Sequence, residues 1–343
     1  MTKLKQIVFT RAYTAEYLEV GERDLGDLAP HEVAVRTVVS TISAGTERAN
    51  FVGEKAVSVF SDAELPFPRT VGYSSAGVVV AVGSAVTRVA VGDRVAVYWG
   101  KHINYQILPE ENVVRIESAQ ISYEEAAVAL IATFPLAAIR KAQLEIGESL
   151  LVMGLGILGQ LAVMEARAAG AHPVIACDPV AERREEALKN GADYAFDPLA
   201  EDFAEQVKAV ADGGVKTAIE VSGLGAGLNE TLDCMARLGR ISLLGCTRSS
   251  DFTVDYYHKV HGPGITLVGA HTSARPDKES YPSHFTHEED IKTVLRLCGG
   301  GRLPIGNLIK ETHVPEECQV VFTRLATEGD FPIGVQFDWR REG

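Results

Sequence analysis

Residues 149–178 read SLLVMGLGILGQLAVMEARAAGAHPVIACD, and this stretch decides the fold. An apolar run at 150–153 is followed by three glycines, an amphipathic segment and a second apolar run at 174–177 that ends on Asp178. Short apolar runs bounded by turn residues are typical of buried strands, and an apolar period near 3.6 is typical of a helix. The stretch therefore predicts a strand, a glycine turn, a helix and a second strand.

The glycines of this turn have the spacing of a dinucleotide-binding loop. Gly154 allows a tight turn, Gly156 allows a close approach of the backbone to a pyrophosphate, and Gly159 allows the helix to pack against the strand. Ile157 and Leu158 open the helix, whose first N–H groups and positive dipole end can bind phosphate. A strand before the glycines and an acidic residue after the next strand are the context that supports this interpretation.

Asp178 is expected to select the cofactor. A carboxylate at this position accepts hydrogen bonds from the ribose hydroxyls of NAD and repels the 2′-phosphate of NADP. Arg183 and Arg184 follow on the next predicted helix, where we expect them to flank the adenine. A contact between these arginines and a 2′-phosphate would weaken the preference, but Asp178 favours NAD.

Composition indicates an ordinary globular protein of 343 residues, long enough for two domains. The net charge of −13 argues against a nucleic-acid partner, which would need a basic surface. The first residues lack the apolar core of a signal peptide and no run of eighteen apolar residues occurs, so we expect no membrane span. Five widely spaced cysteines without a C-x-x-C pair are typical of the reducing cytoplasm.

The chain before about residue 125 has the patterns of strands, and the chain after it alternates between strands and helices. Strand patterns cover 32–38, 76–82 and 93–99. Six later apolar runs, at 150–153, 174–177, 194–196, 218–221, 241–244 and 265–268, predict an α/β fold with a doubly wound, six-stranded parallel sheet.

Several helices and the last strand are also expected from the sequence. A helical pattern at 124–142 contains Pro135, which should kink it or start a new helix. Further helices are predicted at 181–189, 228–237, 288–297 and 318–327, and a final strand at 334–339. The tail is too short to fold alone. We therefore expect one domain at 1–125 with 271–343 and another at 126–270, with the active site between them.

Four motifs, in this order and spacing, resemble the medium-chain dehydrogenase/reductase superfamily, which includes alcohol, sorbitol and threonine dehydrogenases. They are ISAGTE at 42–47, VGYSSAGVV at 71–79, VGDRV at 91–95 and GLGILG at 154–159. The resemblance covers essentially the whole chain. It implies a GroES-like β-barrel catalytic domain and a Rossmann NAD-binding domain.

The chain departs from the zinc-dependent members of that family at the ligand positions. Where those members have a cysteine, a histidine and a glutamate or cysteine, this chain has Ala44, Tyr73 and, near the third position, Ala132. The four closely spaced cysteines of the structural zinc lobe are also missing. A catalytic zinc needs three strong protein ligands. We therefore expect no metal in this protein.

Without a metal, side chains must handle the proton and the developing charge. The resemblance suggests Thr46, which matches a proton-relaying hydroxyl residue, and Glu47 beside it. Tyr73 stands where a metal-binding histidine would be, and Lys101 and His102 lie in a segment that borders the substrate in relatives. A histidine also has a suitable pKa for acid–base work. Each of these side chains could instead have a structural role.

The resemblance also supplies further candidates for the cofactor site. Two segments are expected to contact the nucleotide: one after the fourth strand of the sheet and one after the fifth. Their residues are Val221 and Ser222, beside the adenosine half, and Gly245, Cys246 and Thr247, beside the nicotinamide.

The motifs look most like zinc-lacking polyol and sugar dehydrogenases. We therefore expect hydride transfer between NAD and a hydroxylated small molecule, such as a sugar, polyol, cyclitol or glycoside, with an alcohol becoming a ketone. One alternative is a zinc-free enone or quinone reductase that uses NAD(P)H, and another is a non-catalytic NAD-binding redox sensor. The apolar sixth strand should not remain an open edge, so a homodimer or homotetramer is expected.

Overall fold

The chain in the computed structural model, which describes residues 1–55, 65–247 and 252–342, divides into two units. The first unit consists of Met1–Ile131, Ile291–Gly301 and Ile305–Gly343, and the second consists of Ala132–Asp290 and Arg302–Pro304. The tail therefore returns to the first unit, although residues 271–290 group with the second. The expected domain ranges, 1–125 with 271–343 and 126–270, stay a prediction.

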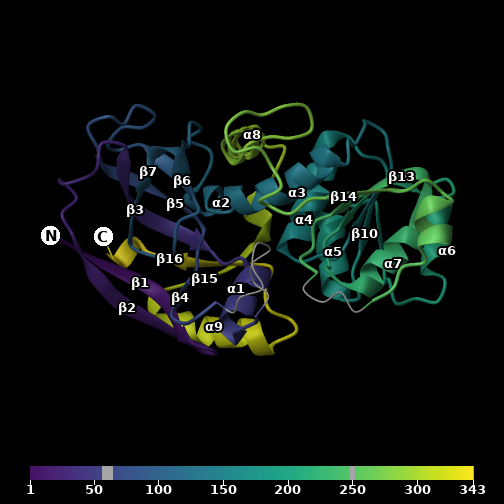
Figure 1. The fold of residues 1–343 in the computed structure, drawn as a ribbon, viewed down its shortest axis with the longest axis horizontal. Coiled ribbons are helices and arrows are strands. Elements are labelled where there is room, and N and C mark those ends of the chain that lie inside the picture. The colour runs from purple at the N-terminus through teal and green to yellow at the C-terminus, as the bar shows by residue number, and fades with distance from the viewer. Residues whose placement is uncertain (56–64, 248–251, 343) are drawn as a thin grey trace. The chain divides into compact units, whose positions relative to one another are not determined.

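The sheet of the second unit has the strand order β11-β10-β9-β12-β13-β14, and its strand pairs are all parallel. Figure 1 labels β10, β13 and β14 among these strands. The strands are β9 (Leu150–Met153), β10 (Val174–Cys177), β11 (Tyr194–Phe196), β12 (Val215–Glu220), β13 (Met235–Leu243) and β14 (Thr266–Gly269). The chain starts at the central strand β9, winds outward to β11 and then crosses back to β12. This order confirms the doubly wound sheet.

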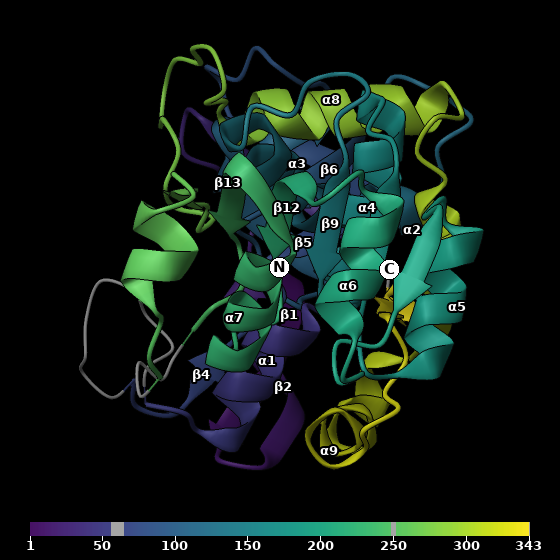
Figure 2. The same ribbon diagram turned by 90° about the vertical axis from the view of Figure 1, so that its right-hand side faces the viewer.

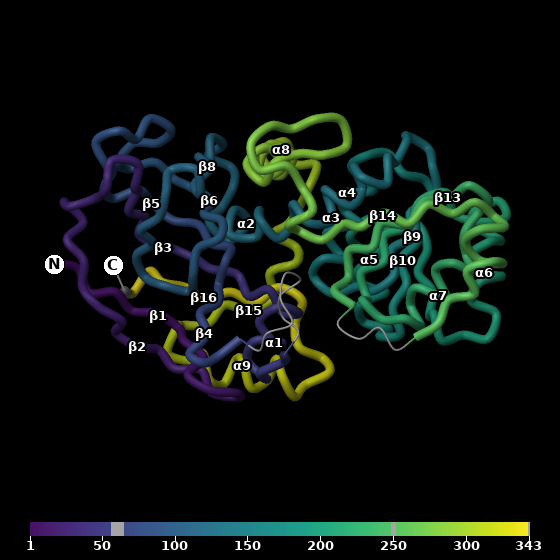
Figure 3. Tube along the Cα trace, viewed as in Figure 1, coloured from purple at the N-terminus to yellow at the C-terminus, as the bar shows by residue number. Residues whose placement is uncertain are grey.

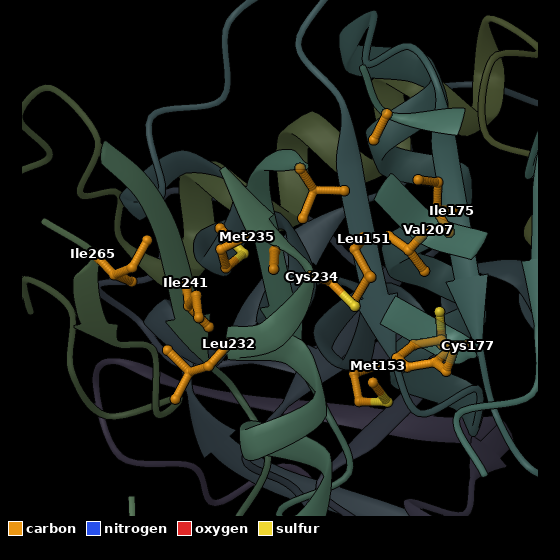
Figure 4. Packing of buried hydrophobic residues seen from close by; sticks show 14 residues of the cluster. Leu151, Met153, Ile175, Cys177, Val207, Leu232, Cys234, Met235, Ile241 and Ile265 are labelled. Atoms are coloured by element: carbon orange, nitrogen blue, oxygen red, sulfur yellow. The ribbon is translucent and has the colours of Figure 1, made fainter. Parts of the chain in front are cut away.

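Helices cover both faces of this sheet, so the strands β9 and β10 are buried on both sides. Leu151 and Met153 point into a core that also contains residues of α6 (Phe203–Val210) and α7 (Gly225–Cys234), as Figure 4 shows in part. Successive side chains of a strand alternate in direction. Leu150 and Val152 therefore face the other way, toward α4 (Ile157–Ala169) and α5 (Ala181–Lys189), which pack against β9 and β10 (Figure 2).

The first unit is built from two sheets, which confirms the β-rich beginning of the chain. The larger sheet has the order β15-β16-β3-β5-β6-β8, with β7 also paired to β3, and the smaller has the order β2-β1-β4. Figure 3 follows the trace of β16 (Gly334–Asp338) back to this unit, where it pairs with β3 (Glu32–Thr41). The other strands are β1 (Thr2–Arg11), β2 (Thr14–Arg23), β4 (Arg69–Thr70), β5 (Ser74–Val82), β6 (Arg94–Tyr98), β7 (Tyr105–Pro109), β8 (Val113–Arg115) and β15 (Ile309–His313).

Two helices of the first unit close an aromatic core. They are α1 (Ala44–Val52) and α9 (Cys318–Thr327), which pack against each other. Phe9, Phe51 and Phe322 meet between the smaller sheet and these helices, with ring centroids 4.7–5.8 Å apart. Edge-to-face rings at such distances stabilise a core beyond the burial of their surface.

Two predicted helix boundaries are wrong. The pattern at 124–142 breaks at residues 127–128, between α2 (Tyr123–Ala126) and α3 (Ala129–Lys141), and Pro135 lies inside α3. The helix predicted at 228–237 ends at Cys234 instead. Met235 takes an extended conformation there because it pairs with Val215 of β12, so sheet pairing overrides the local helical pattern.

The longest helices of the described chain include α3, α4 and α8 (His287–Gly299). Within the ranges that the structure describes, no helix is both long and apolar enough to cross a membrane.

Candidate active site

The glycine turn after β9 has the geometry that its spacing predicts. Gly154 has a φ of +97°, in the left-handed region that favours glycine. A Cβ on Gly159 would lie 1.9 Å from the carbonyl oxygen of Gly154, so the helix and the turn can pack only if residue 159 is glycine. Gly156 is the N-cap residue of α4, and a Cβ placed there would meet nothing within 4 Å. The start of α4, formed by Ile157 and Leu158, therefore has open space beside Gly156 for a phosphate.

Asp178 follows β10 and connects the glycine turn with the next turn. One carboxylate oxygen accepts the N–H of Leu155 at 2.8 Å, and the other accepts the N–H of Val180 at 2.9 Å. The guanidinium of Arg183 lies 3.8 Å from the same carboxylate, and Arg184 donates to the main-chain carbonyl of Asp178. The carboxylate is thus fixed at the carboxyl edge of the sheet, where α/β folds bind their ligands.

Three loops meet at this edge because β9, β12 and β13 are neighbours. The N–H of Val221 donates to the carbonyl of Met153 at 2.8 Å, and a Cβ on Gly154 would lie 2.9 Å from the nitrogen of Ser222. Gly245 also lies against the turn after β12, where an added Cβ would clash with the nitrogen of Gly223. Cys246 and Thr247 follow Gly245 and are exposed. The structure therefore brings the expected cofactor residues of the second unit to one edge of one sheet.

The first unit contains a pair of hydroxyl side chains near the expected catalytic residues. Tyr73 lies just before β5, and its hydroxyl donates to the Oγ of Ser43, the residue before α1. The Tyr73 ring also packs against Trp99, with 5.4 Å between the ring centroids. Sequence reasoning missed Ser43. The signal that could have found it was its place inside the motif at 42–47, directly before Ala44.

Glu47 and His102 form a completely buried pair that is connected to this hydroxyl pair through Ser43. The side chains are 1% and 0% exposed, and His102 Nε2 lies 2.9 Å from Glu47 Oε2. Glu47 Oε1 accepts the N–H of Ser43 at 3.0 Å, and His102 Nδ1 lies 2.7 Å from Ser40 Oγ. Gly72 makes room for this histidine, since a Cβ there would lie 2.2 Å from the backbone nitrogen of His102. This burial favours a positioning role, and the proposed proton transfer by Glu47 and His102 stays a prediction.

Thr46 and Lys101 occupy more accessible places in the same unit. Thr46 is half-buried in the first turn of α1, where its carbonyl accepts the side chain of Asn50. Lys101 is exposed, and both its N–H and its carbonyl are hydrogen-bonded to the side-chain amide of Gln106. The backbone around Lys101 is therefore fixed while its ammonium group faces solvent. The catalytic roles of both residues stay predictions.

The residues at the expected zinc-ligand positions do not fit a zinc ion. Ala44 and Ala132 carry no donor atom, and the Tyr73 hydroxyl is hydrogen-bonded to Ser43. Among the described residues near Tyr73, Glu47 and His102 have side chains of types that ligate zinc, and these two are hydrogen-bonded to each other. A zinc site needs three donors directed at one point together with an open position. The second unit, by contrast, fits a dinucleotide through its glycine turn and Asp178.

Comparison with known proteins gives consistent results. A family model described as an alcohol dehydrogenase GroES-like domain matches residues 29–169, and one described as a zinc-binding dehydrogenase matches residues 158–287. L-threonine 3-dehydrogenase of Pyrococcus abyssi is 29% identical over 305 residues, which cover 78% of this chain and 82% of that protein. D-guloside 3-dehydrogenase of Escherichia coli is 27% identical over 328 residues, covering 89% and 91%.

A solved structure extends the likeness of the fold to nearly the whole chain. Galactitol-1-phosphate dehydrogenase from Escherichia coli superposes with a TM-score of 0.84 at 19% identity, covering 97% of this chain and 99% of that one. The two family matches together run from residue 29 to residue 287, which is more than half of the chain. The protein therefore belongs to the medium-chain alcohol dehydrogenase superfamily of oxidoreductases, with a GroES-like domain and a Rossmann-type nucleotide-binding domain.

Proposed function

We propose that this protein is an NAD-dependent, zinc-independent dehydrogenase that interconverts a secondary alcohol and a ketone on a sugar, polyol, cyclitol or glycoside. The observation that carries the proposal is the hydroxyl pair Tyr73–Ser43, in which Tyr73 occupies an expected zinc-ligand position and Ser43 is hydrogen-bonded to the buried Glu47. NAD, when bound, supplies the hydride acceptor. The chain must then bind it, orient the alcohol and handle one proton.

Asp178 supports the preference for NAD. Its carboxylate is held by two backbone N–H groups and has little freedom to move away from an incoming nucleotide. A 2′-phosphate next to this fixed negative charge would be repelled, whereas ribose hydroxyls can donate to it. The guanidinium of Arg183 lies 3.8 Å from the same carboxylate. The positive charge of Arg183 is therefore already partly neutralised by Asp178 and attracts a 2′-phosphate less strongly.

The Tyr73 hydroxyl is the group that we assign to the proton. A hydroxyl can accept one hydrogen bond while it donates another, so Tyr73 can take the proton of the substrate alcohol as it passes its own to Ser43 Oγ. The Ser43 hydroxyl releases its own proton to solvent water in the same relay, so that one proton leaves the site for each alcohol oxidised. In the reverse direction Tyr73 donates to the ketone oxygen. General acid–base groups of this kind typically contribute a factor of about 10²–10⁴ in rate.

Glu47 and His102 support the hydroxyl pair without touching the substrate. Glu47 accepts the N–H of Ser43, and His102 fixes Glu47 from the other side. Because both side chains are buried, the pair holds the Ser43 backbone in one place. Thr46 and Lys101, which are accessible in the same unit, are proposed to bind further hydroxyl groups of the substrate.

The relatives support a hydroxylated substrate. Those reported above are named for the oxidation of threonine and of a guloside, and a solved structure of the same fold is named for a sugar-alcohol phosphate. Each of these names refers to a molecule that carries a hydroxyl group. Neutral hydroxyls suit the polar side chains of this first unit better than a hydrocarbon would.

We also propose that the chain forms a homodimer or homotetramer. The edge strand β14 pairs with β13, and Thr266, Leu267 and Gly269 on it are exposed. An open apolar edge tends to pair with another chain. Light scattering after size-exclusion chromatography would measure the mass, and a monomer at micromolar concentration would contradict this assembly.

The test of the function compares Tyr73→Phe with Tyr98→Phe. Tyr98 lies on β6, and its hydroxyl donates to the carbonyl of Glu111, so Tyr98→Phe removes a comparable hydrogen bond. NADH production is measured with a panel of polyols and glycosides. Tyr73→Phe should lose at least about 100-fold in kcat with unchanged NADH affinity, while Tyr98→Phe keeps its activity. Equal activity of the two variants, or activity only with enones and NADPH, would contradict the proposal.

A further inference from the structure

Glu220 is a buried carboxylate at the carboxyl end of β12, with only 2% of its surface exposed. Its strand lies between β9 and β13, and in their registers Glu220 stands opposite Met153 and Leu243. The loops that follow these three strands carry the glycine turn and the two other cofactor segments. Glu220 therefore lies close to the start of all three loops.

Hydrogen bonds connect Glu220 with two of these loops. Its carboxylate accepts the hydroxyl of Ser222 and the N–H of Gly223, the latter at 3.2 Å from both oxygens. Its main-chain carbonyl accepts the N–H groups of Leu244 and Gly245 at 2.9 and 2.8 Å. One residue thus holds the turn after β12 by its side chain and the turn after β13 by its backbone.

The third loop is held by close packing. A Cβ on Gly154 would lie 2.9 Å from the nitrogen of Ser222, and a Cβ on Gly245 would lie 2.3 Å from the nitrogen of Gly223. Gly223 has a φ of +67°, and a Cβ there would lie 2.9 Å from the carbonyl oxygen of Cys246. With so little space between the backbones, a shift of the Ser222–Gly223 turn by a few tenths of an ångström must also move its neighbours.

Burial of the Glu220 carboxylate is energetically unfavourable. Burial raises the pKa of Glu220, and the hydrogen bonds from Ser222 and Gly223 lower it again. A buried polar group is tolerated when such bonds replace those it made to water. If the carboxylate were removed, the Ser222 hydroxyl and the Gly223 N–H would lose their acceptor, and the turn would lose the bonds that fix its conformation.

We propose that Glu220 is the positioning residue of the dinucleotide site: its hydrogen bonds hold the turns after β12 and β13, and the close packing of Ser222 against Gly154 aligns the glycine turn with them in the arrangement that binds the cofactor. This inference rests on the proposed function, in which the second unit binds NAD. Glu220 does not touch the nucleotide and acts through Ser222, Gly223 and Gly245. Its side chain therefore sets the affinity for the cofactor, whereas Asp178 sets the preference between NAD and NADP.

The test measures the Kd of the full chain for NADH and NADPH in Glu220→Ala, Glu220→Gln and a control. Glu220→Ala should weaken NADH binding about tenfold or more, since a factor of ten corresponds to one lost hydrogen bond of about 1.4 kcal/mol. NADPH binding should weaken by the same factor because Asp178 is not altered. Glu220→Gln retains one carbonyl oxygen as an acceptor and should recover part of the loss, leaving about a threefold effect.

The control variant is Thr217→Val on the same strand. Thr217 is buried in the first half of β12, and its hydroxyl interacts with Glu148 and Arg240. Thr217→Val should lower the melting temperature and leave the NADH Kd unchanged. This comparison separates the local effect on the loops from a general loss of stability.

Two results would overturn the proposal. One is wild-type NADH affinity in Glu220→Ala, or in Glu220→Gln if the alanine variant does not fold. The other is an equal loss of affinity in Thr217→Val and Glu220→Ala at equal loss of melting temperature. Failure of the wild-type protein to bind either nucleotide has a different meaning, because it contradicts the proposed function and, with it, any role of Glu220 in that function.

Discussion

Replacing His102 by alanine would leave the Glu47 carboxylate inside the first unit without its imidazole partner. The two side chains are 0% and 1% exposed, and their atoms Nε2 and Oε2 are 2.9 Å apart. Removing one partner of a buried, hydrogen-bonded pair typically costs about 3–5 kcal/mol, because the other partner stays buried without compensation. The imidazole also packs edge-on against Phe337, with 5.3 Å between the ring centroids, so a cavity adds to the loss.

The expected effect is large enough to measure by thermal or denaturant unfolding. With about 2–4 °C of melting temperature per kcal/mol for a unit of this size, His102→Ala should melt roughly 6 °C lower or more. Trp339, one of the two tryptophans, provides a buried fluorescence signal. It is 1% exposed, and its indole N–H donates to Ser40 Oγ, which in turn contacts His102.

A matched pair at the surface provides the control. His31 Nδ1 lies 2.9 Å from Glu110 Oε1, the same separation as in the buried pair, but His31 is 71% exposed. Glu110 is 12% exposed, but His31→Ala should still lower the melting temperature far less than His102→Ala, since the His31 imidazole is solvated and Glu110 keeps the N–H groups of Thr87 and Arg88 as partners. In a double-mutant cycle, Glu47→Ala combined with His102→Ala should cost less than the sum of the single losses. Equal small effects of His102→Ala and His31→Ala would refute the reasoning.

Four other substitutions test the second unit. Gly156→Ala should fold normally, because its Cβ meets nothing within 4 Å, but it should lose NADH affinity in a fluorescence titration. Gly159→Ala should lose affinity and also melt at a lower temperature, because its Cβ would lie 1.9 Å from the carbonyl oxygen of Gly154. Equal melting temperatures of the two variants would contradict this. Asp178→Ser should raise the affinity for NADPH relative to NADH by about tenfold or more, and an unchanged ratio of the two Kd values would show that Asp178 does not select the cofactor. Burial raises the pKa of Asp290 from 3.8 to about 6, although Arg140 and Arg275 lower it. The folded state therefore binds a proton at the Asp290 carboxylate more tightly than the unfolded state does. The free energy of unfolding should therefore fall by about 3 kcal/mol as the pH rises from about 4 to about 6 and the contribution of Asp290 is lost. Urea unfolding of the wild type and of Asp290→Asn should diverge in that window. Parallel pH profiles of the two proteins would contradict this expectation.

The parts of the fold that sequence predicted are those determined by local patterns. The glycine spacing at 154–159 follows from steric demands that only glycine meets, and the apolar runs of β9 and β10 follow from burial on both faces. Asp178 could be identified because a strand end fixes where the next residue lies. Helix boundaries were less predictable, since Met235 leaves its helical pattern in order to pair with Val215.

The polar pairs of the first unit could not be predicted in the same way. Glu47 and His102 are distant in the chain, and their contact depends on how α1 and the loop after β6 pack in three dimensions. Gly72 permits that contact by leaving the space beside the His102 backbone empty, a role that its sequence context does not indicate. Ser43 was missed for a similar reason, because its partner Tyr73 becomes visible only in the folded chain.

Metal analysis combined with a chelator assay tests the central claim most directly. Protein purified without a chelator would be analysed for zinc, and NADH production from an active polyol would then be followed before and after treatment with a strong chelator. We predict well below one zinc per chain and undiminished turnover, because Ala44, Tyr73 and Ala132 do not provide a zinc-binding set of donors. Stoichiometric zinc, together with turnover that the chelator abolishes and added zinc restores, would contradict the account.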